Sequence, residues 1–283
     1  VNFIKNNPIE RQPDFISQLF DKATSTLKSQ LKNNDIKRKY IYLGIGDPVF
    51  EKKLAKKNNA STKHDKLAFL FQRGGVIANT DEIKNIYSEV AGSNEEIKAV
   101  ENFFTKEKST LLLREKASET MLKKLNLLDY KVIHFATHGE MSGAINGYNE
   151  PFLVMSPPDF GTKEDDGILT MSEIMLLDNN ADLVILSACN TAMGENSESE
   201  GFSGLAKAFL YSGAKSIFVS NWAVETYAAK ELTVKMVSKM ILKKEDSSQA
   251  LNDTMKEFIQ ENPNKNHPFY WAPFVMVGQN IFL

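Results

Sequence analysis

The stretch ADLVILSACNTAMG, residues 181–194, contains the most apolar run of the chain and its single cysteine, Cys189. The run DLVILSA (182–188) is almost continuously apolar, which is typical of a strand buried on both faces of a sheet. Strands of this kind belong to parallel sheets that are covered by helices. The stretch therefore predicts an α/β fold, and it places a thiol directly after a core strand.

Strand-like and helix-like segments alternate along the rest of the chain. Short apolar runs that end in turn residues predict strands, and apolar residues at three- and four-residue steps predict helices. Alternating β and α units build a mostly parallel sheet with helices on both faces, so we expect about six main strands in that arrangement. The expected strands are 40–45, 109–113, 131–137, 182–188, 216–221 and 273–278, and the expected helices are 9–33, 80–91, 115–128, 170–177, 202–212, 225–243 and 247–260.

Local signals refine this order of elements. Thr80 is the expected N-cap of the helix 80–91, and Thr170 with Glu173 forms a capping box at the start of its helix. Residues 139–168 are rich in Gly, Pro, Asn and Asp, so we expect a long functional loop or hairpin that holds one short strand, FLVMS (152–156).

The composition excludes several broad classes of protein. The chain has 283 residues, a net charge of −2 and 42% hydrophobic residues, which fits an ordinary globular protein and gives no global sign of nucleic-acid binding. One cysteine excludes an internal disulfide framework and favours a reducing compartment, so we expect a cytoplasmic protein. No apolar run is long enough to span a membrane, and the start of the chain lacks both a signal peptide and an initiator Met. We therefore expect a piece of a longer protein.

Two reactive side chains follow consecutive strands of the expected sheet. His138 and Gly139 come after the strand 131–137, and Cys189 comes after 182–188. Open parallel sheets bind ligands at the carboxyl ends of their strands, and consecutive strands are usually neighbours about 4.8 Å apart. An imidazole near a thiol can take its proton or protonate a leaving amine. The N–H groups of Gly139 and Cys189 are candidates for an oxyanion hole.

Other interpretations of the same residues remain open at this point. A lone cysteine in an apolar setting is usually a small buried hydrophobe, and His134 is expected to fill the core with a hydrogen bond. A metal site from His134, His138 and Cys189 lacks a fourth ligand at a usual spacing, so we expect no metal. Residues 44–46 resemble the start of a dinucleotide-binding loop, but the third glycine is missing, so we discard that interpretation.

Several longer motifs carry a family likeness over about residues 40–283. They are YLGIGDPVF (42–50), ANTDEIKNI (78–86), VIHFATHGE (132–140), DGILTMSEI (166–174), ADLVILSACNTAMG (181–194), GFSGLAKAFLYSGAKSIFVSNWAV (201–224) and HPFYWAPFVMVG (267–278). Together they resemble the CHAT domain, a caspase-like peptidase domain that is often attached to tetratricopeptide repeats. One departure is Asn-Trp-Ala-Val-Glu at 221–225, where the family often has Leu-Trp-Pro-Val-Asp, and this changes the rim of the expected cleft.

The resemblance implies a caspase-like fold for residues 39–283, with residues 1–38 as a helical segment or linker to an upstream domain. It implies that Cys189 is the nucleophile and His138 the acid/base in peptide hydrolysis, without a metal or organic cofactor. The implied partners are a protein substrate and an upstream sensor, a repeat domain of the tetratricopeptide type, or a regulatory complex. Relatives occur in bacterial defence and death pathways, including effectors linked to CRISPR systems, so nucleic acid would be an indirect partner only.

The resemblance also places a substrate pocket. In caspase-like folds the pocket for the P1 residue is lined from the ends of the first and fifth main strands and from just before the cysteine, which here gives Asp47, Ser187, Ser220 and Trp222. Asp47 is the only charged residue among them and would favour Lys or Arg at P1, unless it only caps its turn. The competing functions are an interaction module without turnover and a non-proteolytic acyltransferase or thiol hydrolase on the same dyad.

Overall fold

The computed structural model describes residues 38–50, 77–145, 148–187 and 200–283, with no side-chain description for 200–203. The statements below concern these residues. The expected helix at 9–33, most of the proposed linker 1–38 and Cys189 lie outside them. No helix of the described part is both long enough and apolar enough to cross a membrane.

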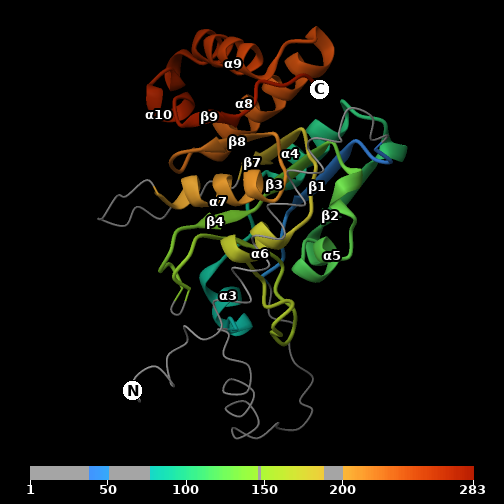
Figure 1. Ribbon diagram of the computed structural model, residues 1–283. Helices are drawn as coiled ribbons and strands as arrows, with labels where there is room; N and C mark the ends of the chain where they lie inside the picture. The colour runs from blue at the N-terminus through green and yellow to red at the C-terminus, as the bar shows by residue number, and fades with distance from the viewer. Residues whose placement is uncertain (1–37, 51–76, 146–147, 188–199) are drawn as a thin grey trace, which may run out of the picture.

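A six-stranded sheet forms the centre of the molecule, as predicted (Figure 1). All neighbouring strands in it are parallel except the last pair, β8 and β9, which is antiparallel. The third and fourth strands of the order, β3 and β7, are direct neighbours, so the expected adjacency of the two strands is confirmed. In spatial order the strands are β2 (Ser109–Leu113), β1 (Tyr42–Gly46), β3 (Val132–Ala136), β7 (Leu183–Leu186), β8 (Ser216–Ser220) and β9 (Phe274–Gly278).

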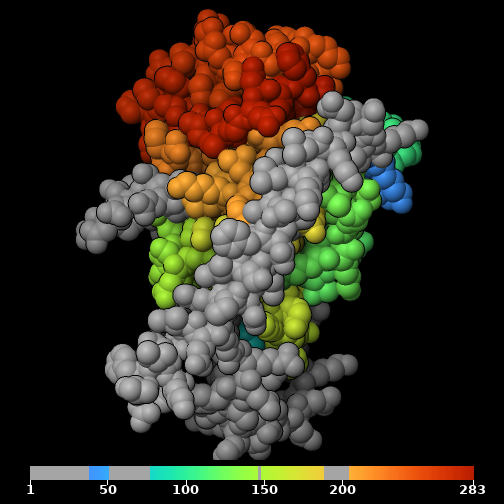
Figure 2. All heavy atoms as spheres, viewed as in Figure 1, coloured from blue at the N-terminus to red at the C-terminus, as the bar shows by residue number. Residues whose placement is uncertain are grey.

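Helices cover both faces of this sheet, because successive side chains of a buried strand point to opposite sides. Leu43 and Ile45 of β1 belong to one core, and Tyr42 belongs to the other. The first core is closed by α5 (Glu119–Lys123), α6 (Met171–Leu176) and α7 (Glu200–Tyr211). The second is closed by α4 (Ser93–Glu101), α8 (Thr226–Ser238) and α9 (Ser247–Glu261). In Figure 2 the segment from α8 to the C-terminus, orange to red, forms one end of the molecule.

A second, smaller sheet follows the histidine. It contains β4 (His138–Glu140), β5 (Phe152–Val154) and β6 (Ile168–Thr170), which are antiparallel to one another. The expectation of a long loop or hairpin with one strand over 139–168 is therefore wrong in detail. The strands are three residues each and were hidden by the turn residues between them. With α3 (Thr80–Ile86), this sheet encloses a third core that includes Phe50, Ile83 and Phe152.

The stretch predicted as one helix, 80–91, is the start of a helix pair. The helix α3 ends at Ile86, and α4 begins after Gly92, whose positive φ of 78° suits a glycine. The N-cap of α3 is Asn79, whose side chain accepts from the N–H of Asp81, so the expectation of Thr80 in this position is wrong by one residue. No helix was expected over Ser93–Glu101, where α4 lies.

Other helices agree better with the sequence. The capping box of Thr170 and Glu173 is present at the start of α6. The helix α8 continues as a π-helix, Lys239–Lys243, so the prediction over 225–243 is confirmed in extent. The expected helix at 115–128 is reduced to the five residues of α5, with a 3-10 turn on either side, Arg114–Lys116 and Leu127–Asp129. A short helix, α10 (Pro268–Trp271), precedes β9.

Two glycines of β1 allow α4 to lie against the sheet. A Cβ atom built on Gly44 would lie 2.6 Å from Cγ2 of Ile97, and one on Gly46 would lie 3.2 Å from Cγ1 of the same side chain. Ile97 is fully buried in the second core. The Gly-Ile-Gly sequence therefore serves close packing between a strand and a helix, because a larger residue would push α4 away.

Gly44→Ala is expected to lower the free energy of unfolding by about 1–3 kcal/mol, since the added methyl overpacks the contact with Ile97. Ile97→Leu removes the γ2 methyl at nearly constant volume, so in the double variant the cost of Gly44→Ala shrinks. Denaturant unfolding of both single variants and the double variant measures this coupling. Strictly additive costs would contradict the proposed contact.

Candidate functional site

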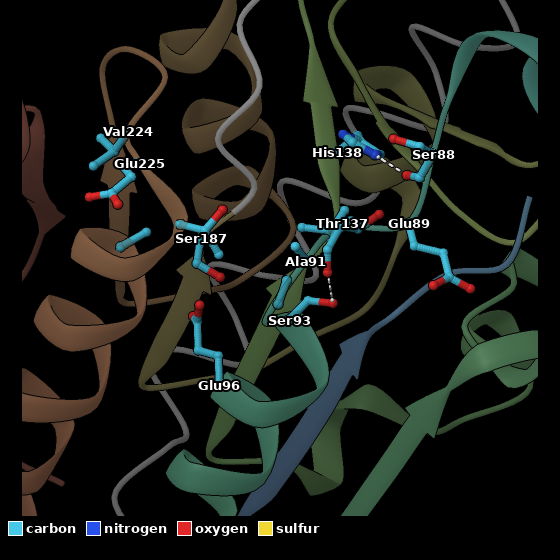
Figure 3. Close-up of a pocket in the computed structure, with 14 residues that line it drawn as sticks. Ser88, Glu89, Ala91, Ser93, Glu96, Thr137, His138, Ser187, Val224 and Glu225 are labelled. Carbon is cyan, nitrogen blue, oxygen red and sulfur yellow. Dashed lines mark hydrogen bonds between the residues drawn. The ribbon is translucent and has the colours of Figure 1, made fainter.

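A cavity of about 320 Å³ opens at the carboxyl ends of β3 and β7 (Figure 3). Its walls come from the chain between α3 and α4, from the first turns of α4, from the junction of β3 and β4, from the end of β7 and from the start of α8. This is the position where parallel sheets bind ligands. It contains His138 and Ser187, two of the residues that the sequence singled out.

His138 is held in a defined orientation. Its Nε2 donates to the backbone carbonyl of Ser88 at 2.7 Å, and its ring packs between those of Phe50 and Tyr87, with centroids 5.8 and 5.2 Å away. A carbonyl only accepts, so in the neutral ring the proton is on Nε2 and Nδ1 is the basic nitrogen. Burial lowers the pKa of His138, and the Ser88 carbonyl opposes that effect. The environment thus favours a neutral imidazole with a fixed tautomer.

A second titratable group lies on the same short strand. Burial raises the pKa of Glu140 to about 7, while a hydrogen bond from Tyr87 partly opposes the shift. Burial also raises the pKa of the Tyr87 hydroxyl. Glu140 therefore holds the tyrosine whose ring packs against His138, and it exchanges a proton near neutral pH.

The floor of the cavity is a hydrogen-bonded group around His134. Its Nδ1 is 2.9 Å from the Tyr42 hydroxyl, and its Nε2 is 2.9 Å from Oε1 of Glu96 and 3.1 Å from Oγ of Ser187. His134 is fully buried in β3, which confirms the expected core histidine with a hydrogen bond. His138 starts β4 in the other sheet, so the two histidines lie on different strands.

Cys189 lies outside the described residues, and Ser187 is the last described residue before it in the chain. The N–H of Ser187 donates to the carbonyl of Phe135 at 3.0 Å, which continues the pairing of β7 with β3. The side chain of Ser187 lines the cavity. Gly139 follows His138 in β4, opposite Leu153 of β5.

The other residues expected in a substrate pocket lie outside the lining of this cavity. The Asp47 carboxylate accepts from Nδ2 of Asn94 at 2.7 Å and from Nη1 of Arg114 at 3.3 Å. Ser220 is buried at the end of β8, and the Nε1 of Trp222 donates to the carbonyl of Phe269. The cavity thus brings His138 and Ser187 together, and Asp47 is held by partners of its own.

Three glutamates line the cavity, and only Glu225 belongs to a stretch that the sequence placed at the rim of the expected cleft. They are Glu89, Glu96 and Glu225. Glu96 lies on α4, and the failure to predict that helix concealed it. The signal that was available is the first turn after Gly92, where Glu95 and Glu96 suit a helix N-terminus. Among the described residues, no group of three or more His, Cys, Asp or Glu side chains is placed to hold a metal ion.

The mostly parallel central sheet, with His138 two residues after β3 and a cavity shared with the end of β7, is that of an α/β protein consistent with a caspase-like fold. The chain matches the family model of the CHAT domain over residues 11–279 and belongs to that family. The motif-based resemblance is thereby confirmed.

Two curated relatives have the same name, tetratricopeptide repeat protein 28. The mouse protein is 25% identical to this chain over 187 residues, and the human protein is 24% identical over 186 residues. In both cases the match covers 56% of this chain and 7% of the relative. The chain therefore corresponds to a small part of these relatives.

Burial of the His138 ring predicts a pKa below the ordinary value of 6.5. Phe50→Ala opens one side of the ring to water and is expected to raise the pKa toward that value. NMR titration of the histidine ring protons, in a Cys189→Ala background, measures the pKa of His138 with Phe50 present and with Phe50→Ala. The variant His138→Gln identifies which resonance belongs to His138. Phe160→Ala, at an exposed ring far along the chain, is the control and should leave the pKa unchanged. A pKa of 6.5 or more before Phe50 is replaced would contradict this account.

Proposed function

We propose that the domain is a cysteine endopeptidase in which Cys189 is the nucleophile and His138 the general acid and base. The observation that carries the proposal is the shared cavity: His138 forms one wall, and Ser187, two residues before Cys189, lines the same space. Membership of the CHAT family supports the assignment, since that domain is related to cysteine peptidases.

The fixed tautomer of His138 suits this chemistry. In the proposed reaction Nδ1 takes the thiol proton, the thiolate attacks the peptide carbonyl, and the imidazolium then protonates the leaving amine. The N–H groups of Gly139 and Cys189 are the proposed donors to the tetrahedral oxyanion. Water, deprotonated by Nδ1, then hydrolyses the thioester and restores the thiol. The Ser88 carbonyl keeps the proton on Nε2 and stabilises the imidazolium.

The proposal extends to the setting of the domain. The two relatives are named as tetratricopeptide repeat proteins, and the match covers 7% of each. We place this domain as the effector part of a larger regulated protein of the defence or cell-death type, with a repeat or sensor segment as its partner. The proposed location is the cytoplasm, where a single catalytic thiol stays reduced.

Proteomics of newly formed N-termini tests the proposal. Cells that make the full-length protein should contain cleavage fragments that are absent with Cys189→Ala and reduced by about 10²–10⁴-fold with His138→Ala, since proton transfer supplies gains of that size. The matched control is His267→Asn. His267 lies outside the cavity, where its side chain caps α10, so the protein with this substitution should cleave its substrates normally.

Fragments that persist with Cys189→Ala would exclude this protein as their source. The domain would then be a caspase-like interaction module without turnover. Acylated products in place of shortened proteins would instead assign an acyltransferase on the same dyad.

A further inference from the structure

The cavity beside His138 is lined by acidic side chains and by no lysine or arginine among the described residues. Two of its three glutamates are already neutralised. Glu89 pairs with Arg114 at 2.7 Å, and Glu225 pairs with Lys265 at 2.5 Å. Both glutamates are about half exposed, so water screens what charge remains.

Glu96 is different from these two. The residue is 4% exposed, and among the described residues its only ion-pair partner is His134. Its Oε1 accepts from Nε2 of His134, and its Oε2 has no hydrogen-bond donor within that part of the chain. Figure 3 shows the carboxylate directed toward Ser187, between the wall of His138 and that of Val224 and Glu225.

The imidazole of His134 has several buried partners. Its Nε2–H donates to Oε1 of Glu96, and its Nδ1 lies 2.9 Å from the hydroxyl of Tyr42, which also donates to the carbonyl of Ile97 at 3.3 Å. Ser187 accepts from the same Nε2–H, because its own hydroxyl donates to the carbonyl of Phe135 at 3.2 Å. These contacts orient the carboxylate of Glu96 at the cavity. A lysine or arginine side chain that enters the cavity would give this carboxylate a second partner beside His134.

We propose that Glu96 selects substrates with lysine or arginine at P1, the residue whose carbonyl is attacked. This inference rests on the proposed peptidase function. The cavity adjoins His138 and the strand that leads to Cys189, so a side chain that fills it belongs to the residue at the scissile bond. Its volume is at the lower end of the range for ligand sites, which fits one long side chain.

Glu96, and not Asp47, is the residue assigned to this role. The charge of Asp47 is already met by Arg114 and Asn94, and its side chain is outside the lining of the cavity. Both residues would give the same preference for a basic P1 side chain, so variants of each separate the two assignments.

The experiment compares peptides that differ only at P1, using sequences from cleavage sites found in the proteome. Arginine is compared with citrulline, which has nearly the same shape without the charge, and with glutamate. The unmodified full-length protein is expected to cleave the arginine peptide with a kcat/KM about 30-fold or more above that of the citrulline peptide. This measurement does not depend on the folding of any variant.

In Glu96→Gln the same ratio is expected to fall to about 3-fold or less, with cleavage of the citrulline peptide retained. Glu95→Gln, at the exposed neighbouring residue of α4, is the matched control and should keep the ratio of the unmodified protein. Asp47→Asn should keep it as well.

Equal rates for arginine and citrulline in an active enzyme would overturn the inference and leave the peptidase function intact. A ratio that falls with Asp47→Asn and persists with Glu96→Gln would overturn the role of Glu96. Absence of Cys189-dependent cleavage of every P1 peptide would overturn the peptidase function, and this inference with it.

Discussion

The buried hydrogen bonds of His134 tie together the parts of the fold that form the site. One imidazole joins β1 through Tyr42, α4 through Glu96 and the end of β7 through Ser187. Each of these polar groups is buried, so each must be paired, and the geometry of one constrains the others. The helix α4 can reach this ring because Gly44 and Gly46 carry no side chain where Ile97 packs. The position of the cavity floor therefore follows from two glycines and one histidine.

The sheet was predictable because its strands are short, apolar and buried on both faces. Runs such as LVIL of β7 and SIFVS of β8 are apolar without interruption, or nearly so, and end at turn residues. The elements that were not predicted are those whose secondary structure depends on contacts with residues far away in the sequence. The helix α4 has a polar sequence, SNEEIKAVE, and is fixed by burial of Ile97 and Val100 against the sheet. The strands of the second sheet exist only as a set, since none of its three-residue strands is stable alone.

The same division applies to the site. His138 and the strand before Cys189 were predictable because reactive residues at the carboxyl ends of neighbouring strands converge. The carboxylate of Glu96 at the cavity floor was not predictable, because α4 has no clear pattern of apolar residues and reaches the cavity only through tertiary packing. Asp47 shows the reverse case. Its position after β1 was clear from the sequence, but its pairing with Arg114 across 67 residues of chain was not.

The Ser88 carbonyl that orients His138 belongs to the connection between α3 and α4. Tyr87, beside it, packs against the third core with the second sheet, whereas α4 packs against the central sheet. One hydrogen bond of 2.7 Å therefore ties the connection between α3 and α4 to the first residue of β4. Without that acceptor nothing in these contacts would keep the proton on Nε2, so the choice of the basic nitrogen of His138 depends on where this connection lies.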